Sequence, residues 1–165
     1  MENSFGKLPE NEEQRLAKLR SLNILDTYEE NGTFKHIAAV ASRMFDVPIA
    51  LVNFVVKDYV VTKAGVGMGL AKEVSRDVSL CSLAVLRNDV TVFENTLKEP
   101  CLLASPLVTG EFGLRFYAAA PLTTPEGYNI GAVCIVDKKP RKFSASDQKM
   151  LETLASAVMD EIEKK

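Results

Sequence analysis

The chain has 165 residues, of which 47% are hydrophobic and 25% charged, so it is long enough for one domain with a full core and too short for two comfortable ones. Its 20 basic and 22 acidic residues give a net charge of −2, which favours neither a nucleic-acid partner nor an anionic membrane surface. No apolar run approaches the roughly 18–20 residues of a membrane span, and the polar opening lacks a signal-peptide core. Three cysteines without a Cys-x-x-Cys pair argue against a secreted disulfide framework, so we expect a cytoplasmic protein.

A flexible tail at residues 1–9 is expected to precede a single domain over residues 10–165, which opens with two predicted helices. The first carries acidic residues in its first turn and leucines at three-residue spacing. Asp26 or Thr27 is the expected cap of the second helix, whose apolar residues repeat at spacings of 3, 4 and 7. Pro48 marks the end of that helix.

The middle of the chain is predicted to alternate between strands and short irregular segments. The apolar run Ile49–Val56 is typical of a strand covered on both faces, and a tight turn leads into a second strand at Tyr59–Val66. Residues 72–78 are expected to form a loop, after which Ser79 is expected to cap a short helix. A short strand at Val90–Phe93 follows.

The last third of the chain gives the clearest pattern. A loop with one helical turn is expected over residues 95–113, followed by two strands at Leu114–Thr123 and Tyr128–Asp137. Ser144 with Asp147 three residues later predicts a capping box at the start of a long terminal helix.

These elements predict an α+β fold with a largely antiparallel sheet, because the strands come as hairpins. We expect the opening and closing helices to pack together on one face. The short helix and the long loop would then cover the other face, which is a natural place for a cavity.

Most common catalytic and cofactor motifs are missing from the sequence. There is no Walker-type phosphate loop, no dinucleotide-binding G-x-G-x-x-G after a strand and no H-E-x-x-H. Gly65, Gly67 and Gly69 lead into a loop, which favours an irregular turn over a phosphate cradle. His36, the only histidine, lies beside a helical apolar stripe and is expected to be a surface or partly packed residue. The sequence therefore predicts no metal ligands and no catalytic residues.

The cysteines are the most reactive candidates. Cys81 lies in the first turn of the short helix, where the helix dipole lowers a thiol pKa. Its interpretations are a redox centre, a cofactor attachment point or a small core residue. Cys134 lies in the middle of a strand, as is typical of an inert packed thiol. Cys101 lies in the loop, and the sequence leaves its distance from Cys81 open.

Three polar side chains complete the candidate ligand-binding set of Asn53, Cys81, Arg115, Tyr117 and Cys134. Asn53 interrupts an apolar strand, so its amide must bond nearby backbone or face a polar cavity. Arg115 and Tyr117 share one face of their strand. Alanines on the opposite face allow close approach by another element or a ligand.

The run SPLVTG followed by LRFYAAAPL, at residues 105–122, closely resembles GAF domains, especially those of bacterial sensor histidine kinases and diguanylate cyclases. Supporting segments occur at residues 48–52, 78–81 and 131–137. The resemblance covers roughly residues 14–163 in the order that the family has.

The resemblance implies a GAF-like sheet of about six antiparallel strands, with a pocket on one face and the terminal helices on the other. Family members typically regulate signal transduction by binding cyclic nucleotides, tetrapyrroles, haem or other small molecules, or they dimerise without a known ligand. It therefore implies a non-catalytic sensory module with an unidentified small-molecule ligand and a homodimer through the terminal helices. An effector such as a kinase or cyclase would lie in another chain or in a region outside this sequence.

Departures from the family pattern leave the cofactor unknown. The subgroup usually reads Cys-x-His in the short helix, and Leu83 stands where that histidine is expected. Bilin attachment is therefore not supported, and the N-K-x-F signature of the cyclic-nucleotide branch is absent. The strand beginning at Tyr59 keeps only part of the subgroup's usual sequence pattern, which suggests a more apolar or side-chain-filled pocket. Two alternative functions remain: a thiol-dependent redox enzyme using Cys81, similar to the free methionine sulfoxide reductases, and a ligand-free dimerisation scaffold.

Overall fold

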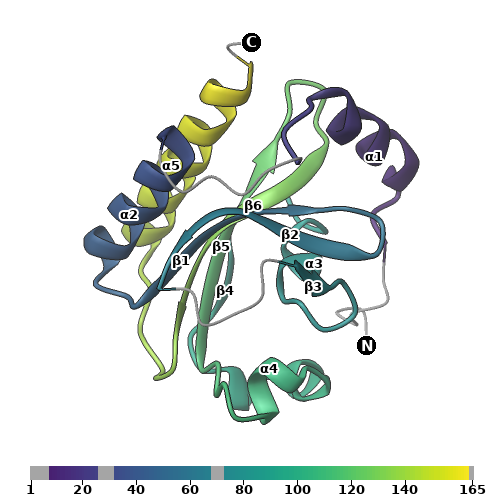
Figure 1. Cartoon of the computed structure of the whole chain (residues 1–165). Helices are drawn as coiled ribbons and strands as arrows, with labels where there is room; N and C mark the ends of the chain where they lie inside the picture. The colour runs from purple at the N-terminus through teal and green to yellow at the C-terminus, as the bar shows by residue number, and fades with distance from the viewer. Residues whose placement is uncertain (1–7, 26–31, 68–72, 164–165) are drawn as a thin grey trace.

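A computed structural model describes residues 8–25, 32–67 and 73–163 of the chain (Figure 1). Within them, six antiparallel strands form one sheet in the order β3-β2-β1-β6-β5-β4, so β1 and β6 lie at its centre. The predicted α+β class and the sheet of six antiparallel strands are confirmed. The strands are β1 (Ile49–Val55), β2 (Tyr59–Val66), β3 (Glu73–Ser75), β4 (Thr91–Phe93), β5 (Phe116–Thr123) and β6 (Asn129–Asp137).

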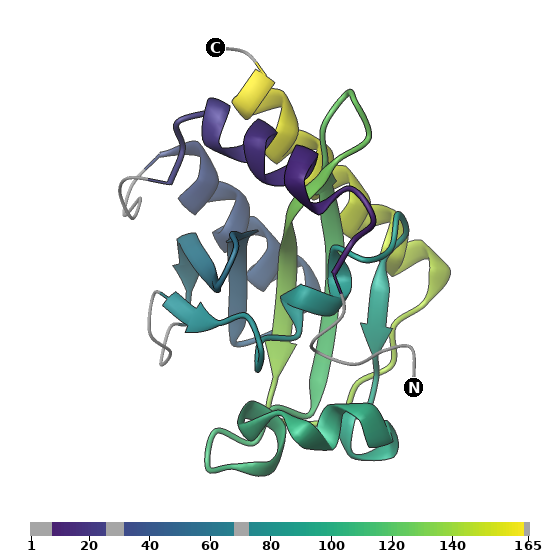
Figure 2. The same cartoon turned by 90° about the vertical axis from the view of Figure 1, so that its right-hand side faces the viewer.

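Helices cover both faces of the sheet, and the two faces differ in kind. The long helices α2 and α5 lie side by side on one face, as Figure 1 shows. The short helix α3 lies against the other face, and Figure 2 shows it in front of the sheet, with α4 at the lower end of the strands. The helices are α1 (Glu12–Ser21), α2 (Thr33–Phe45), α3 (Cys81–Ala84), α4 (Pro106–Thr109) and α5 (Ala145–Glu163), with 3-10 helices at Thr96–Lys98 and Pro100–Ala104. No described helix is long and apolar enough to cross a membrane.

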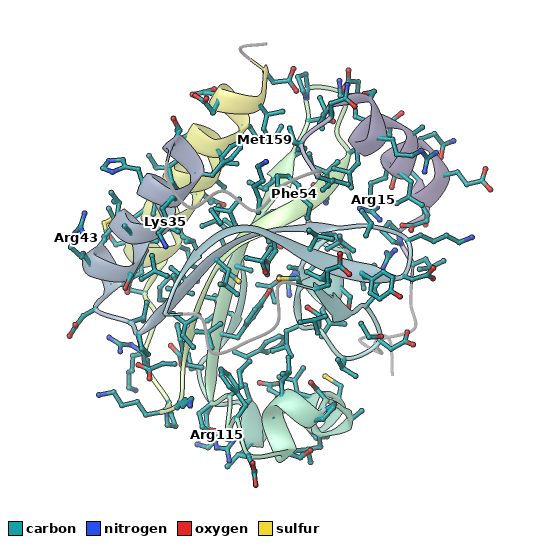
Figure 3. The ribbon with its side chains drawn as sticks, viewed as in Figure 1. Arg15, Lys35, Arg43, Phe54, Arg115 and Met159 are labelled. Atoms are coloured by element: carbon teal, nitrogen blue, oxygen red, sulfur yellow. The ribbon has the colours of Figure 1, made fainter. Side chains whose placement is uncertain are left out.

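The central strands are buried on both faces, so their alternating side chains enter two separate cores. Phe54 of β1 and Met159 of α5 belong to the core beneath the long helices (Figure 3). Val55 and Cys134 belong to the second core, beneath α3. The second core is the one that contains polar side chains at its centre.

The terminal helix α5 begins with the predicted capping box. The Ser144 backbone N–H donates to Asp147 Oδ2 at 2.9 Å, and the Asp147 N–H donates to Ser144 Oγ at 3.1 Å. These reciprocal bonds satisfy two backbone donors that a helix start would otherwise leave unpaired. The sequence prediction is confirmed here in its atomic detail.

Helix α1 is fastened to the sheet by a buried ionic cluster that the sequence did not predict. Arg15 has no exposed surface and donates to the carbonyl oxygen of Val55 at 2.7 Å (Figure 3). Glu12 accepts from Arg15 at 3.0 Å and from Arg76 at 2.6 Å. Burial alone would raise the pKa of Glu12, but the hydrogen bonds and charges of Arg76 and Arg15 hold it below its usual value.

Two sequence predictions for the irregular segments were wrong. Residues 73–75, expected in a loop, form β3 because the edge of β2 offers free backbone groups to Val74 and its neighbours. The segment 95–113 contains two 3-10 helices and α4 instead of a single helical turn. Helix α3 begins at Cys81, and its cap position is Leu80 instead of the expected Ser79. Ser79, one residue earlier, accepts from the Cys81 N–H with its Oγ at 3.2 Å. The expected caps Asp26 and Thr27 lie outside the described residues.

Candidate functional site

A cavity of about 30 Å³ lies between the sheet and α3, which is room for one or two water molecules. Its floor comes from β1, β2, β5 and β6, and its roof comes from β3, α3 and α4. Seven apolar residues and six with polar or thiol groups line it. The lining residues are Leu51, Asn53, Val60, Thr62, Val74, Ser79, Leu80, Cys81, Leu107, Leu114, Tyr117, Cys134 and Val136.

Asn53 is held in this cavity by an irregularity in strand pairing. The register of β1 with β2 shifts between Val52 and Asn53, so that Asn53 faces Thr62. Thr62 Oγ1 donates to Asn53 Oδ1 at 2.8 Å, which fixes the amide and directs its NH₂ group at the sulfurs. Asn53 Nδ2 lies 3.3 Å from Cys81 Sγ and 3.7 Å from Cys134 Sγ.

The two thiols form a buried pair with unequal surroundings. Cys81 and Cys134 are 2% and 1% exposed, and their sulfurs lie 4.0 Å apart. The Tyr117 hydroxyl donates to Cys81 Sγ at 3.0 Å. Hydrogen bonding from Cys134 lowers the pKa of Cys81 against the opposing effect of burial, and donors on Asn53, Tyr117 and Ser79 bring it to about 7. Hydrogen bonding to Cys81 and burial raise the pKa of Cys134 well above its ordinary value.

The hydroxyl of Tyr117 stays protonated beside the two thiols and therefore acts as a hydrogen-bond donor. Burial, followed by the negative charge shared by the two sulfurs, raises its pKa well above the ordinary value. Its ring stacks on Phe93 with centroids 6.3 Å apart. The site is therefore a rigid set of donors around one sulfur, Cys81 Sγ.

The structure brings together four of the five predicted site residues and leaves Arg115 elsewhere. Arg115 precedes β5, and its guanidinium donates to the carbonyl oxygens of Val108 at 2.7 Å and Leu114 at 3.1 Å, outside the cavity lining (Figure 3). The expectation that it shares the cavity face with Tyr117 does not hold, because the regular strand begins only at Phe116. Arg115 instead hydrogen-bonds a backbone carbonyl in the last turn of α4.

The thiol pairing also differs from the sequence interpretation. Cys134, interpreted as an inert packed thiol, contacts Cys81 directly. Cys101 is half-buried on a 3-10 helix and does not line the cavity. Burial and the charge of Glu99 raise its pKa, so it differs from Cys81 in both surroundings and acidity.

Thr62 is the polar member of the site that sequence reasoning missed. It alternates along β2 with residues facing the opposite core, but the sequence did not reveal the bulge that pairs it with Asn53. His36 is exposed on α2, as expected. Among the described residues, no group of three or more side chains could hold a metal ion.

A larger groove of about 1060 Å³ lies on the outside of the domain, between α1 and the β1–β2 turn. Leu16 and Tyr59 line it together with exposed charges. No cysteine lines this groove, and its buried Arg76 and partly buried Glu12 already pair with one another. The small cavity is therefore the better candidate site.

Comparison with known proteins agrees with the geometry. The sequence profile of the GAF domain family matches residues 29–162. The chain belongs to the GAF domain family. It is 35% identical over 155 residues to a cyclic di-GMP phosphodiesterase of Pseudomonas aeruginosa, covering 93% of this chain and 26% of that protein. The GAF domain thus spans about a quarter of the length of this relative.

Two solved structures share the fold of this GAF domain. The GAF domain of an Acinetobacter phosphoenolpyruvate-protein phosphotransferase has a TM-score of 0.67 at 14% identity, covering 95% of each chain. A type II free methionine-R-sulfoxide reductase of Thermoplasma acidophilum has a TM-score of 0.65 at 19% identity, covering 93% of this chain and 95% of its own. At such identities the likeness establishes the fold alone. Membership of the family supports a regulatory or sensory module in signalling.

Proposed function

We propose that this GAF domain is a non-catalytic sensory module that takes a small ligand into the cavity between the sheet and α3. The observation that carries the proposal is the group of buried polar side chains, Asn53, Thr62, Cys81 and Tyr117, directed into an otherwise apolar cavity. Such a combination of apolar walls and a few convergent polar groups is typical of small-molecule sites.

In this conformation the cavity has room for one or two water molecules, so a larger ligand requires the roof to move. The roof consists of short elements, α3 and α4 with four residues each and β3 with three. Such elements can shift without breaking the long ladders of the central sheet, so opening is expected to be local. A change in roof position is the signal that we propose for this module.

A thermal-shift screen with nucleotides, haem and small metabolites tests ligand binding. A compound at a hundred times its Kd adds about 2.7 kcal/mol of stability, which should raise the Tm of a domain of this size by about 5–10 °C. Leu107→Ala removes a roof side chain and should admit larger compounds than the wild-type protein does. Leu103→Ala, at an exposed leucine of the adjacent 3-10 helix, is the matched control and should change nothing.

The ligand proposal fails if no compound stabilises either the wild-type protein or Leu107→Ala, and if native mass spectrometry of protein from its own cells finds only the bare chain. The remaining interpretation would then be a ligand-free scaffold that acts by dimerising. Exposed methionines support a contact through the helical layer, since Met44 of α2 and Met150 of α5 are 44% and 38% exposed. Light scattering at high concentration tests this, and a strict monomer would exclude the homodimer.

The output of the module is proposed to be a signalling enzyme. The likeness to one segment of a cyclic di-GMP phosphodiesterase supports an effector of the kinase, cyclase or cyclic-dinucleotide class, in another chain or another part of a longer protein. The activity of such an enzyme should be measured in the presence and absence of this domain. Each measurement should be repeated with a compound that stabilises the domain, which tests whether the domain regulates the enzyme.

A thiol-dependent redox enzyme is the second candidate, because the lowered pKa of Cys81 favours a thiolate near neutral pH. The small volume of the cavity argues against it, since a substrate the size of free methionine sulfoxide exceeds one or two water molecules. Turnover of that substrate which disappears in Cys81→Ser and persists in Cys101→Ser would favour the enzyme over the sensor.

A further inference from the structure

The proposed binding of a small ligand gives no role to the close pairing of the thiols of Cys81 and Cys134. Cys81 and Cys134 come from segments 53 residues apart in sequence, and their sulfurs are 4.0 Å apart inside the second core. Among the described residues no third metal ligand joins them, so the arrangement suits a reaction between the two sulfurs better than a metal site.

The pair is asymmetric in a way that assigns a role to each sulfur. Cys81 Sγ receives the Tyr117 hydroxyl at 3.0 Å and the Asn53 amide at 3.3 Å, and Thr62 fixes that amide. Donors of this kind stabilise a thiolate, which is the nucleophilic form of cysteine. Cys134 lacks the tyrosine donor and stands on the central strand β6, so it suits the role of the resolving thiol.

The cavity limits which oxidant can reach Cys81. A volume of about 30 Å³ under an apolar roof of Val74, Leu80 and Leu107 fits a molecule near the size of water. A hydroperoxide as small and uncharged as hydrogen peroxide meets both conditions. A charged disulfide such as oxidised glutathione meets neither.

We propose that Cys81 and Cys134 form a redox switch that hydrogen peroxide closes into a disulfide. The Cys81 thiolate attacks one peroxide oxygen, the O–O bond breaks, and hydroxide leaves and takes up a proton to become water. The resulting Cys81 sulfenic acid is then attacked by the sulfur of Cys134, which loses its proton, and a second water leaves. The two sulfurs give up two electrons, and the peroxide is reduced to two molecules of water.

Closing the bond must change the roof of the cavity. The sulfurs have to approach from 4.0 Å to about 2.05 Å, and α3, a four-residue helix, is freer to move than β6. The disulfide sulfur is a poorer acceptor than a thiolate, so Tyr117 loses its charged partner. The switch therefore acts on the same α3 roof as the proposed ligand, although its chemistry needs no ligand.

Counting free thiols in the folded protein tests the proposal. After graded hydrogen peroxide, quenching and unfolding, the count for the wild-type protein should fall from three to one, and dithiothreitol should restore it. Peptide mapping should find the bond between Cys81 and Cys134 with Cys101 still free. In Cys101→Ser, the matched control, the count should fall from two to zero. Oxidised glutathione should leave the wild-type count at three over the same time.

Two variants separate the assigned roles. In Cys134→Ser, the sulfenic acid should persist on Cys81 and be trapped when the protein is unfolded in the presence of dimedone, because the folded cavity is too small for this reagent. In Cys81→Ser, Cys134 should stay reduced at the same peroxide dose. Circular dichroism melting checks that each variant folds, and hydrogen exchange over α3 in the oxidised wild-type protein gives a readout that needs no variant.

Three results would overturn the switch. One is oxidation of Cys101 ahead of an intact Cys81–Cys134 pair in the folded wild-type protein. Another is oxidation of Cys134 in Cys81→Ser as fast as in the wild-type protein. The third is a disulfide that forms only in urea. Each can occur whether or not a small ligand is found, so failure of the switch and failure of the ligand proposal are distinguishable.

Discussion

Tyr117→Phe tests whether the hydrogen bonds at Cys81 set the acidity of its thiol. The substitution removes the 3.0 Å bond from the Tyr117 hydroxyl and keeps the ring that stacks on Phe93. A hydrogen bond to a charged acceptor contributes roughly 1.5–3 kcal/mol, and 1.36 kcal/mol equals a factor of ten in an ionisation constant. The pKa of Cys81 should therefore rise from about 7 to roughly 8–9 in the variant.

The thiolate absorbance in the ultraviolet, followed against pH in a Cys101→Ser background, measures this change. Cys81→Ser in the same background identifies which thiol is titrating. Tyr59→Phe is the matched control, because Tyr59 is 50% exposed and lies outside the cavity. An unmoved midpoint in Tyr117→Phe, or a wild-type midpoint at the ordinary value of a free thiol, would refute the reasoning.

The lowered pKa of Cys81 also predicts that the stability of the fold rises with pH. The folded value of about 7 lies below the roughly 8.5 of a free thiol, so ionisation of Cys81 stabilises the fold above the unfolded value, and this contribution is lost as pH falls through 7. Between pH 7 and 8.5 the gain is on the order of 1 kcal/mol. Above that range the raised pKa of Cys134 opposes it. Tyr117→Phe should flatten the rise of stability with pH in denaturant titrations.

Three further substitutions test the scaffold, each by denaturant unfolding. Arg15→Met leaves the partly buried Glu12 carboxylate with Arg76 alone and the buried Val55 carbonyl without its donor, and should cost about 1–3 kcal/mol, whereas Arg20→Met, exposed on the same helix, should stay within about 0.5 kcal/mol. Gly131→Ala would drive a methyl group into the backbone of β1 and should cost more than about 3 kcal/mol; a change below about 1 kcal/mol would contradict the close approach. Ser144→Ala removes the cap of α5 and should cost about 1 kcal/mol, while Ser156→Ala, exposed within that helix, should not destabilise it.

The elements that the sequence predicted well are those whose signal is local. The strand at Tyr59–Val66 has the predicted bounds, and the capping box of Ser144 and Asp147 forms as predicted, because period and cap chemistry depend on neighbouring residues. β3 was missed because its three residues become a strand only by pairing with the edge of β2. The roles of Arg15 and Arg76 were missed for the same reason. The Val55 carbonyl that Arg15 binds lies 40 residues away along the chain, and the Glu12 carboxylate that Arg76 binds lies 64 residues away.

The candidate site was predicted in its residue types and missed in its pairing. Asn53 was identified because a lone amide in an apolar strand must find a partner, and the structure supplies Thr62 across a bulge. Cys81 was identified from its place at a helix start. Its main partners, Tyr117 and Cys134, come from the strands β5 and β6, and no pattern along the chain indicates that they lie close to Cys81.

The absence of the expected histidine at Leu83 says less about this cavity than the sequence suggested. Leu83 is buried in the second core, but it does not line the cavity, so the polar groups there come from other positions. What the cavity presents instead is one sulfur surrounded by hydrogen-bond donors and faced by a second sulfur. In a volume of one or two water molecules, these groups distinguish oxidants by size and charge more readily than they distinguish large ligands by shape. A roof of short helices then gives a small-molecule signal and an oxidative signal the same element to move, α3, so each should alter the response to the other.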